Sequence, residues 1–295
     1  MLVVVFVHES PAVTLRKTRS TTSAELFTPG AQLLMDAYFE PIATDEYQPT
    51  EFAGGAWQAN EIHFSPLGGL IVHAMDRHRA EHATSDDAKE LGRISFDILG
   101  FLAADVCTVT VQTLRPGRTI ELLEATVTIA DRAAVLARAW YIATADTSAV
   151  AGGAVAPMAS PDQGMDWSMT DTWPGGFVAS LEMKTPAPPK PGRTSAWLRT
   201  DIALVAGEPS SAHAAFIALV DTANGVAVRE SPTEWMFPNL DLTIHLHRQP
   251  TGVWVGLDTS VTFGPAGHGL TSSVLHDELG PIGRAEQILT VRQLG

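Results

Sequence analysis

The sequence is poor in cysteine. Cys107 is the only cysteine among the 295 residues, so no disulfide can form within the chain. It lies in an apolar alternating run, which is typical of a buried side chain rather than of a nucleophile. Because structural disulfides belong to oxidising compartments, we expect a cytoplasmic protein.

Basic residues are also scarce. The chain has 19 Lys and Arg against 33 Asp and Glu, a formal net charge of −14. Nucleic acids and anionic membranes bind clustered Lys and Arg, so neither is an expected partner. The apolar residues 1–7 are too few to cross a bilayer, and polar residues follow them. We therefore interpret residues 1–30 as a leader without a membrane anchor.

Several catalytic signatures are missing. The chain contains no G-x-S-x-G, Walker A or G-x-G-x-x-G motif, which argues against an α/β-hydrolase and against nucleotide-binding folds. One H-x-x-E-H pattern occurs, from His78 to His82. It falls at the polar end of a predicted helix, where histidines suit the helix dipole, so we favour a surface role over zinc. We predict no metal and no cofactor.

The elements that are present occur twice in the same order. Ser65 and Pro66 begin a predicted helix over residues 64–82, with apolar residues at helical spacing. Strands are predicted after it at 93–99, 106–114, 119–129 and 137–143. A second helix, 209–225, is followed by strands at 240–247, 252–263, 269–277 and 285–292. Upstream segments are predicted as a helical turn (33–39) and as strands (51–57, 175–184, 194–205).

This order indicates an internal duplication. We predict an α+β fold of two tandem units, residues 31–144 and 175–295, each an antiparallel sheet wrapped around one long helix. Residues 145–174 are rich in Ala, Gly, Ser and Pro without periodicity, and we interpret them as a linker.

The strand at residues 240–247 alternates apolar and polar residues. Leu240, Leu242, Ile244 and Leu246 share one face, and Asp241, Thr243, His245 and His247 share the other. Asp241 is therefore either a solvated strand-edge charge or a catalytic base. His245 and His247 could ligate a metal, but no further ligand stands at a familiar spacing.

The C-terminal half resembles the acyl-CoA thioesterases of the thioesterase II type, which are double hotdog proteins. The matching segments are residues 237–248, 260–262, 267–270 and 283–292. In the N-terminal half, Trp57, His63 and the pair Gly68-Gly69 resemble the family's entry to its central helix.

The resemblance implies metal-free hydrolysis of acyl-CoA thioesters. The family holds its hydrolytic water with an Asp, a Thr and a Gln, which correspond by position to Asp241, Thr262 and Gln287. The helix start would supply substrate and oxyanion contacts through His63, Gly68 and Gly69, although close packing explains the glycine pair equally well. Arginines that could neutralise coenzyme A phosphates are Arg115, Arg118, Arg248 and Arg284.

Other functions stay open at this point. A duplicated hotdog could bind acyl-CoA or another acyl ligand without turnover, because shared folds host unrelated functions. Hydration of an enoyl thioester is disfavoured, since no Asp is followed by a His five residues later. We expect one active site per chain, a homo-oligomer built through open sheet edges, and a role in lipid metabolism.

Overall fold

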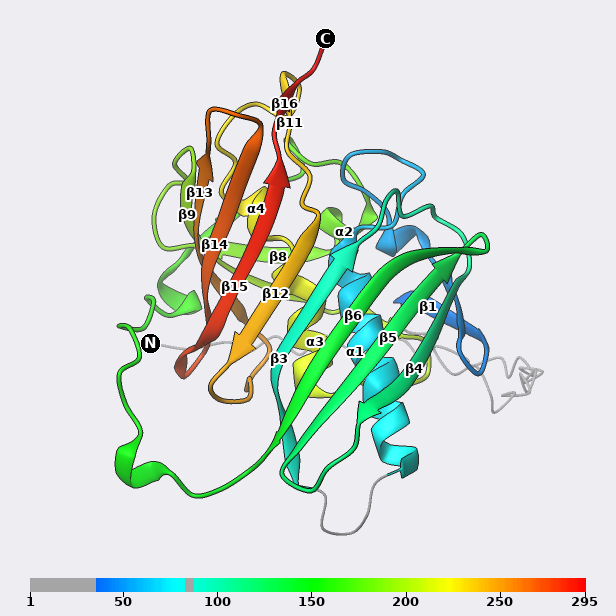
Figure 1. Ribbon diagram of the computed structural model, residues 1–295. Coiled ribbons are helices and arrows are strands. Elements are labelled where there is room, and N and C mark those ends of the chain that lie inside the picture. The colour runs from blue at the N-terminus through cyan, green and yellow to red at the C-terminus, as the bar shows by residue number, and fades with distance from the viewer. Residues whose placement is uncertain (1–35, 83–87) are drawn as a thin grey trace, which may run out of the picture. The chain divides into compact units, whose positions relative to one another are not determined.

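The computed structural model describes residues 36–82 and 88–295, so the predicted leader lies outside the described residues. The described chain forms a 14-stranded sheet that curves around the central helices, together with a small two-stranded sheet (Figure 1). This arrangement confirms the predicted α+β double hotdog.

The first unit contains one long helix, as predicted. Helix α1 spans Phe64–His82, and its residues from Phe64 to Met75 are all buried. The strands of this unit are β1 (Ala37–Ala43), β2 (Glu46–Pro49), β3 (Lys89–Ile98), β4 (Cys107–Arg115), β5 (Ile120–Ile129) and β6 (Arg132–Ala143).

The second unit repeats the helix and the four long strands that follow it. Its helices are α2 (Gly176–Ala179), α3 (Ala212–Val220) and α4 (Ala223–Val226). Its strands are β7 (Met165–Trp167), β8 (Leu181–Thr185), β9 (Arg193–Thr200), β10 (Ala203–Val205), β11 (Trp235–Met236), β12 (Asp241–Leu246), β13 (Val255–Phe263), β14 (His268–Asp277), β15 (Gly280–Thr290) and β16 (Arg292–Gln293).

Four local predictions were wrong. The strand predicted at residues 175–184 begins instead with helix α2, Gly176–Ala179, and only β8, Leu181–Thr185, is strand. Residues 51–57 do not form a strand but begin with a 3-10 turn, η1 (Glu51–Ala53), which the Thr50 side chain caps. The predicted helical turn at 33–39 is strand from Ala37 onward, because β2 pairs with it. The helix predicted for 209–225 is interrupted after Val220 and resumes at Ala223.

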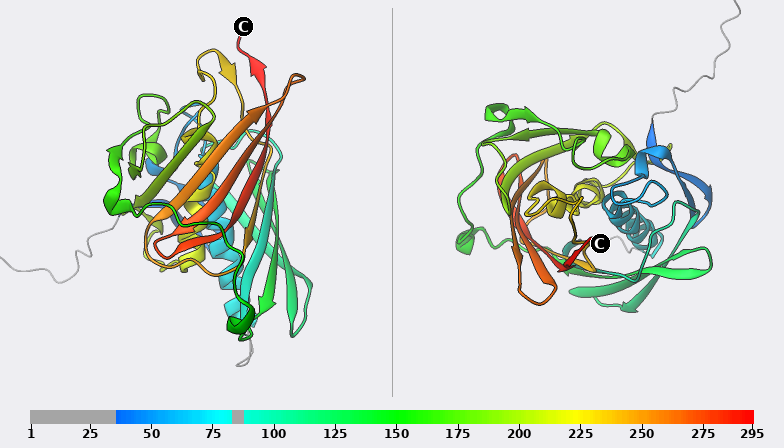
Figure 2. Two further views of the ribbon diagram at one scale, coloured as in Figure 1. Left: turned by 90° about the vertical axis from the view of Figure 1, so that its left-hand side faces the viewer. Right: turned by 90° about the horizontal axis from the view of Figure 1, so that it is seen from above.

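The two units join through their sheets. Strands β3 and β12 pair antiparallel, with Thr243 opposite Ser95 at the middle of the ladder. At the other margin of the first unit, β10 pairs parallel with β1. Seen from above, the sheet encloses the helices of both units (Figure 2).

Helices α1 and α3 pack against each other in opposite directions. The Ser65 and Thr222 hydroxyls lie 3.3 Å apart at one end of the pair, and Ser211 donates a hydrogen bond to Asp76 at the other. The first turn of α1 therefore meets the last turn of α3. No helix in the described part of the chain is long and apolar enough to cross a membrane.

Candidate active site

A pocket of about 330 Å³ opens where α1 begins and α3 ends. Trp57, His63 and Phe64 line it from the first unit, and Asp221 and Asn239 from the second. A smaller recess of about 40 Å³ shares Trp57, His63, Asp221 and Asn239. The walls are mostly apolar with a few convergent polar groups, which is the usual composition of a small-molecule site.

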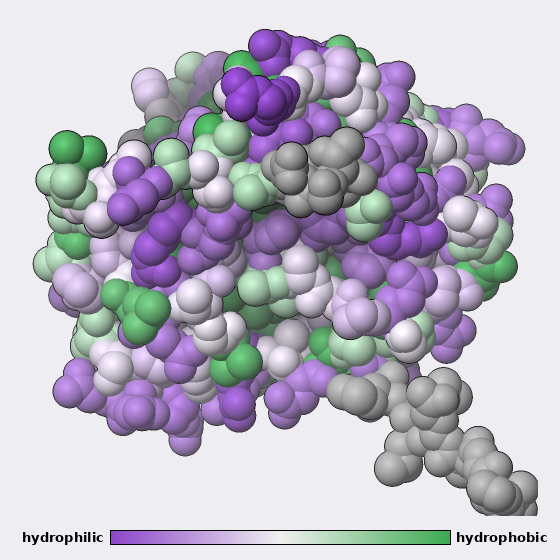
Figure 3. Space-filling model, turned by 90° about the horizontal axis from the view of Figure 1, so that it is seen from below, coloured by the Kyte–Doolittle hydropathy of each residue, from purple (hydrophilic) through white to green (hydrophobic). Residues whose placement is uncertain are grey.

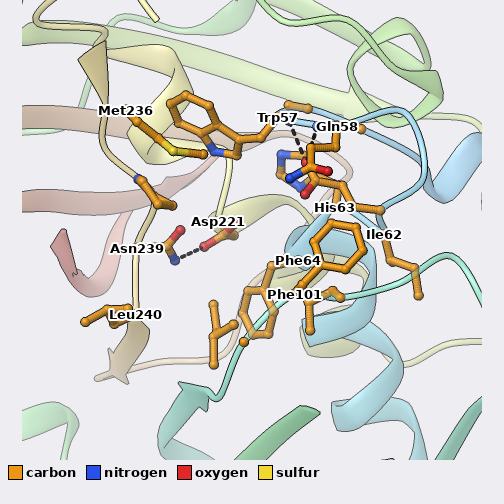
Figure 4. A pocket seen from close by; sticks show the side chains of 17 residues that line it. Trp57, Gln58, Ile62, His63, Phe64, Phe101, Asp221, Met236, Asn239 and Leu240 are labelled. Carbon is orange, nitrogen blue, oxygen red and sulfur yellow. Dashed lines mark hydrogen bonds between the residues drawn. The ribbon is translucent and has the colours of Figure 1, made fainter. Parts of the chain in front are cut away.

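Asp221 is the buried acid of this pocket. It caps the C-terminus of α3, and only 7% of its surface is exposed. Its Oδ1 accepts one hydrogen bond from Asn239 Nδ2 and one from Gln287 Nε2, both at 2.7 Å. Figure 4 shows the Asn239 amide and the Asp221 carboxylate pointing toward each other inside the pocket.

The two amides leave part of this cluster free for a ligand. Both donors bind Oδ1 of Asp221, and no donor to Oδ2 is found among the described residues. Gln287 is 1% exposed, and its Oε1 has no hydrogen-bond partner in the described chain. A buried polar atom without a partner costs free energy, so a water or substrate group is expected beside it.

Burial changes the acidity of Asp221. It raises the pKa of the carboxyl group from 3.8 to about 7, while the hydrogen bonds from Asn239 and Gln287 act in the opposite direction. A carboxyl group with a pKa near 7 can both accept and return a proton at neutral pH, which suits a general acid–base catalyst.

The predicted trio of Asp241, Thr262 and Gln287 does not converge. Thr262 lies opposite Leu270, and Leu270 lies opposite Ile288, which is exposed on the outer face of the sheet. Gln287 precedes Ile288 in β15, so its side chain points to the inner face. Thr262 and Gln287 therefore lie on opposite faces.

Asp241 is on the outer face as well. Its strand neighbour Thr243 lies opposite Glu286, the outward residue before Gln287. The Asp241 carboxylate accepts a hydrogen bond from the backbone N–H of Ile288 at 2.7 Å, and burial raises its pKa. Of the three predicted residues, the register brings only Gln287 into the pocket cluster.

This placement predicts that outer-face substitutions are mild. We expect Asp241→Asn and Thr262→Val each to keep thioester turnover within about threefold of wild type, because neither side chain faces the water-excluding pocket. The measurement is kcat/KM for an acyl-CoA ester, with Asn239→Ala as the inner-face counterpart. A 100-fold or larger loss of kcat/KM in Asp241→Asn would contradict this placement and favour the catalytic trio predicted from the sequence.

His63 lies in the pocket, where the sequence placed a substrate contact. Its Nδ1 accepts a hydrogen bond from the Ser65 backbone N–H at 3.1 Å, and its ring packs on Phe177 with 4.3 Å between centroids. Burial lowers its pKa to about 3. The imidazole is therefore neutral at physiological pH and caps the start of α1.

Of the glycine pair, Gly69 has a packing role. A Cβ atom on Gly69 would lie 2.5 Å from the Cβ of Ala218 and 3.0 Å from the backbone oxygen of Ala214, so this glycine lets α1 and α3 touch. A Cβ atom on Gly68 would meet only ordinary contacts at 3.5 Å or more. Both residues follow the first turn of α1, so their backbone N–H groups donate hydrogen bonds within the helix and are not free for a substrate.

Sequence reasoning missed Asp221 and Asn239. Asp221 was hidden inside the single helix predicted over residues 209–225, within the mostly apolar run 214–223. A usable signal was present, because a carboxylate in an apolar run near a helix C-terminus is unfavourable both for burial and for the helix dipole. Such a violation of local preference is characteristic of functional sites.

The arginines proposed for coenzyme A do not line the pocket. Arg248 makes two hydrogen bonds to the buried carboxylate of Asp277, and Arg115 donates to the backbone oxygen of Ile120. Arg284 lies on the outer face of β15. Arg292 lies nearer to the pocket, since its guanidinium donates a hydrogen bond to Sδ of Met236, which lines the pocket.

Comparisons with known proteins agree with this architecture. Family models match both halves of the chain: the acyl-CoA thioesterase N-terminal domain covers residues 54–142, and the C-terminal domain covers residues 156–291. Together they span more than half of the sequence. No curated protein sequence matches the chain.

Solved structures share the fold at low sequence identity. A putative thioesterase from Novosphingobium aromaticivorans is 19% identical with a TM-score of 0.64, covering 86% of this chain and 98% of its own. The tesB protein of Mycobacterium avium subspecies paratuberculosis is 16% identical with a TM-score of 0.63, at 86% and 96% coverage. A hot dog protein of unknown function from Alicyclobacillus acidocaldarius is 10% identical with a TM-score of 0.66, also at 86% and 96% coverage.

The site therefore lies in a chain whose two halves both match thioesterase domains and whose sheet encloses a pair of central helices. This protein belongs to the acyl-CoA thioesterase family and is a thioester hydrolase.

Proposed function

We propose that the protein hydrolyses acyl-CoA thioesters with a water activated by Asp221. Asn239 and Gln287 take the positioning roles, in place of the Asp241 and Thr262 expected from the sequence. The observation that carries this proposal is the buried Asp221 carboxylate, whose Oδ1 two side-chain amides hold at 2.7 Å. No metal or cofactor takes part in the proposed reaction.

The proposed reaction uses the free atoms of the cluster. A water lies between Oδ2 of Asp221 and Oε1 of Gln287, which fixes both of its hydrogens. Its oxygen attacks the thioester carbonyl carbon as Asp221 takes one proton. The tetrahedral intermediate then loses the C–S bond, and Asp221 returns the proton to the departing sulfur. The products are the carboxylic acid and the coenzyme A thiol.

The start of α1 can stabilise the oxyanion. Of its first N–H groups, that of His63 donates to the Ala53 carbonyl, that of Ser65 donates to His63 Nδ1, and Pro66 has none. This leaves the N–H of Phe64 without an acceptor in the described chain. We assign the oxyanion contact to Phe64, rather than to Gly68 or Gly69, because the helix dipole adds partial positive charge there.

The acidity of Asp221 predicts a pH profile. Because the base must be ionised, kcat/KM should rise with pH, with an apparent pKa of about 7, and level off above it. A rate profile from pH 5 to 9 with a neutral acyl thioester tests this. A kcat/KM that is already constant from pH 5 upward would contradict the assignment, since an ordinary carboxylate is largely ionised at pH 5.

The carboxyl group of Asp221 also makes the free energy of unfolding depend on pH. Its pKa is raised on folding, so its contribution to the free energy of unfolding is full below about pH 4 and is lost as pH rises through about 7. Wild type should therefore lose more stability than Asp221→Asn between pH 5 and 8. Urea unfolding at both pH values measures the difference.

The last proposal concerns the location, assembly and metabolic role of the protein. We propose a cytoplasmic homo-oligomer that acts in lipid metabolism. The single cysteine, Cys107, is buried, and burial raises its pKa to about 12, so it is not a reactive thiol. Exposed apolar side chains on the outer face, such as Leu270 and Ile288, offer contact surface for another copy. Light scattering of the purified chain tests the assembly.

A further inference from the structure

The outer face of the sheet carries a row of basic residues where the two units join. His245 on β12 lies directly opposite Arg93 on β3 and directly opposite Arg284 on β15. Residues paired in this way project to the same face with about 5 Å between their Cβ atoms. The three side chains thus stand side by side across three adjacent strands.

No carboxylate neutralises this row. Within the described residues, neither Arg93 nor Arg284 has an ion-pair or hydrogen-bond partner for its guanidinium group. The two guanidinium groups belong to strands on either side of β12, so their positive charges add at this point of the sheet. On a chain of net charge −14, an uncompensated basic row is a local exception to the general potential.

A pocket of about 390 Å³ lies against the row. His245, His247 and Arg284 line it from the sheet, and residues 153–155 of the segment between the units line it as well. Glu286 is the one carboxylate among the lining residues, and it accepts a hydrogen bond from the Ser272 hydroxyl. The wall therefore combines basic side chains with an exposed stretch of backbone.

The charges of the row favour an anion over a cation as the ligand of this pocket. Seen from below, the surface of the molecule mixes hydrophilic and hydrophobic residues (Figure 3). A metal at the histidine pair is disfavoured, because Arg93 and Arg284 flank His245 and would repel a cation.

We propose that this outer-face pocket binds a phosphate group of a small phosphorylated anion. The guanidinium of Arg284 offers a planar fork that matches phosphate oxygens, and His245 and His247 add further donors. Residues 153–155 complete the lining of the site. Because Asp221 and Gln287 face the inner side of the sheet, this site is separate from the hydrolytic pocket and does not depend on its proposed mechanism.

Calorimetric titration of the full-length protein tests the proposal. The probes are inorganic phosphate and ADP, which distinguish a free phosphate from a nucleotide source. Wild type is compared with Arg284→Gln, with the double variant Arg93→Gln/His245→Gln, and with Arg132→Gln as a control. Arg132 is also exposed and unpaired among the described residues, but it begins β6 far from the row.

We expect saturable binding of at least one probe to wild type and to Arg132→Gln. Arg284→Gln and the double variant should each weaken it tenfold or more, while thioester turnover stays within twofold of wild type. Tighter binding of ADP than of phosphate would identify a nucleotide ligand, and equal binding a free phosphate. The proposal fails if neither probe binds saturably, or if Arg132→Gln weakens binding as much as Arg284→Gln does.

Discussion

Asp221→Asn is expected to lower kcat/KM for acyl-CoA hydrolysis by about 10³-fold, with the fold intact. The amide that replaces the carboxylate cannot take a proton from water, and loss of a general base typically costs about 10² to 10⁴ in rate. Folding should survive, because the new carbonyl oxygen can accept the hydrogen bonds from Asn239 and Gln287. Thiol release from a panel of acyl-CoA esters measures the effect.

Two further variants separate catalysis from packing. Gln287→Ala should lower kcat by about 10²-fold, since it removes both a donor to Asp221 and an acceptor for water. Asp201→Asn changes an exposed acid outside the pocket and should leave turnover unchanged. Binding of a non-hydrolysable thioether analogue of the substrate should persist in Asp221→Asn.

The outcomes distinguish the competing functions. Full turnover in Asp221→Asn would remove Asp221 from the mechanism while keeping the enzyme. A wild-type protein that binds the thioether tightly but hydrolyses no acyl-CoA ester of any chain length would instead be the acyl-ligand binding protein that the sequence left open. Loss of both binding and turnover in Asp221→Asn, with unchanged unfolding, would place the residue in substrate binding alone.

Gly69→Val is expected to lower the free energy of unfolding by about 3 kcal/mol. Its Cβ atom would lie 2.5 Å from the Cβ of Ala218 and 3.0 Å from the backbone oxygen of Ala214, so α1 and α3 would have to separate. Overpacking of this kind costs about 1–3 kcal/mol, and a β-branched residue adds crowding within the helix. Urea unfolding with unchanged m-values gives the measurement.

Gly68→Ala is the matched control, one residue away on the same helix. Its Cβ atom would be at least 3.5 Å from its neighbours, so the variant should be as stable as wild type or up to about 1 kcal/mol more stable, through better helix propensity. Equal destabilisation by the two substitutions would contradict the close helix contact. Unchanged turnover in Gly68→Ala would agree with an oxyanion contact at the first turn instead.

Sequence patterns were sufficient for the elements whose signals are local. The helix at Phe64–His82 has its own start signal, Ser65 and Pro66, and apolar residues at helical spacing. The eight long strands following α1 and α3 carry period-2 patterns or turn residues at their ends, and their repetition in the two halves gave the double hotdog. The short strands β7, β10, β11 and β16 carry too few residues for such a signal.

The location of the site was a harder problem, because it depends on which face of each strand is inside. The alternation along β12 already placed Asp241 on one face and the apolar Leu242 and Ile244 on the other. The core covers the face of Leu242 and Ile244. Thr262 and Gln287 could not be assigned to faces without the ladder between β13, β14 and β15. A shift of one residue in register exchanges the two faces of a strand.

The sequence by itself determined the duplicated order of helix and strands, since this depends on residue order and local periodicity, and its resemblance to the thioesterases implied Gln287 as a candidate. Only the tertiary structure decided that Asp221 and Asn239 surround Gln287, while Asp241 and Thr262 face outward. The reason is that a catalytic cluster is defined by distance and burial. These emerge only when α1, α3 and three strands far apart in the sequence pack together.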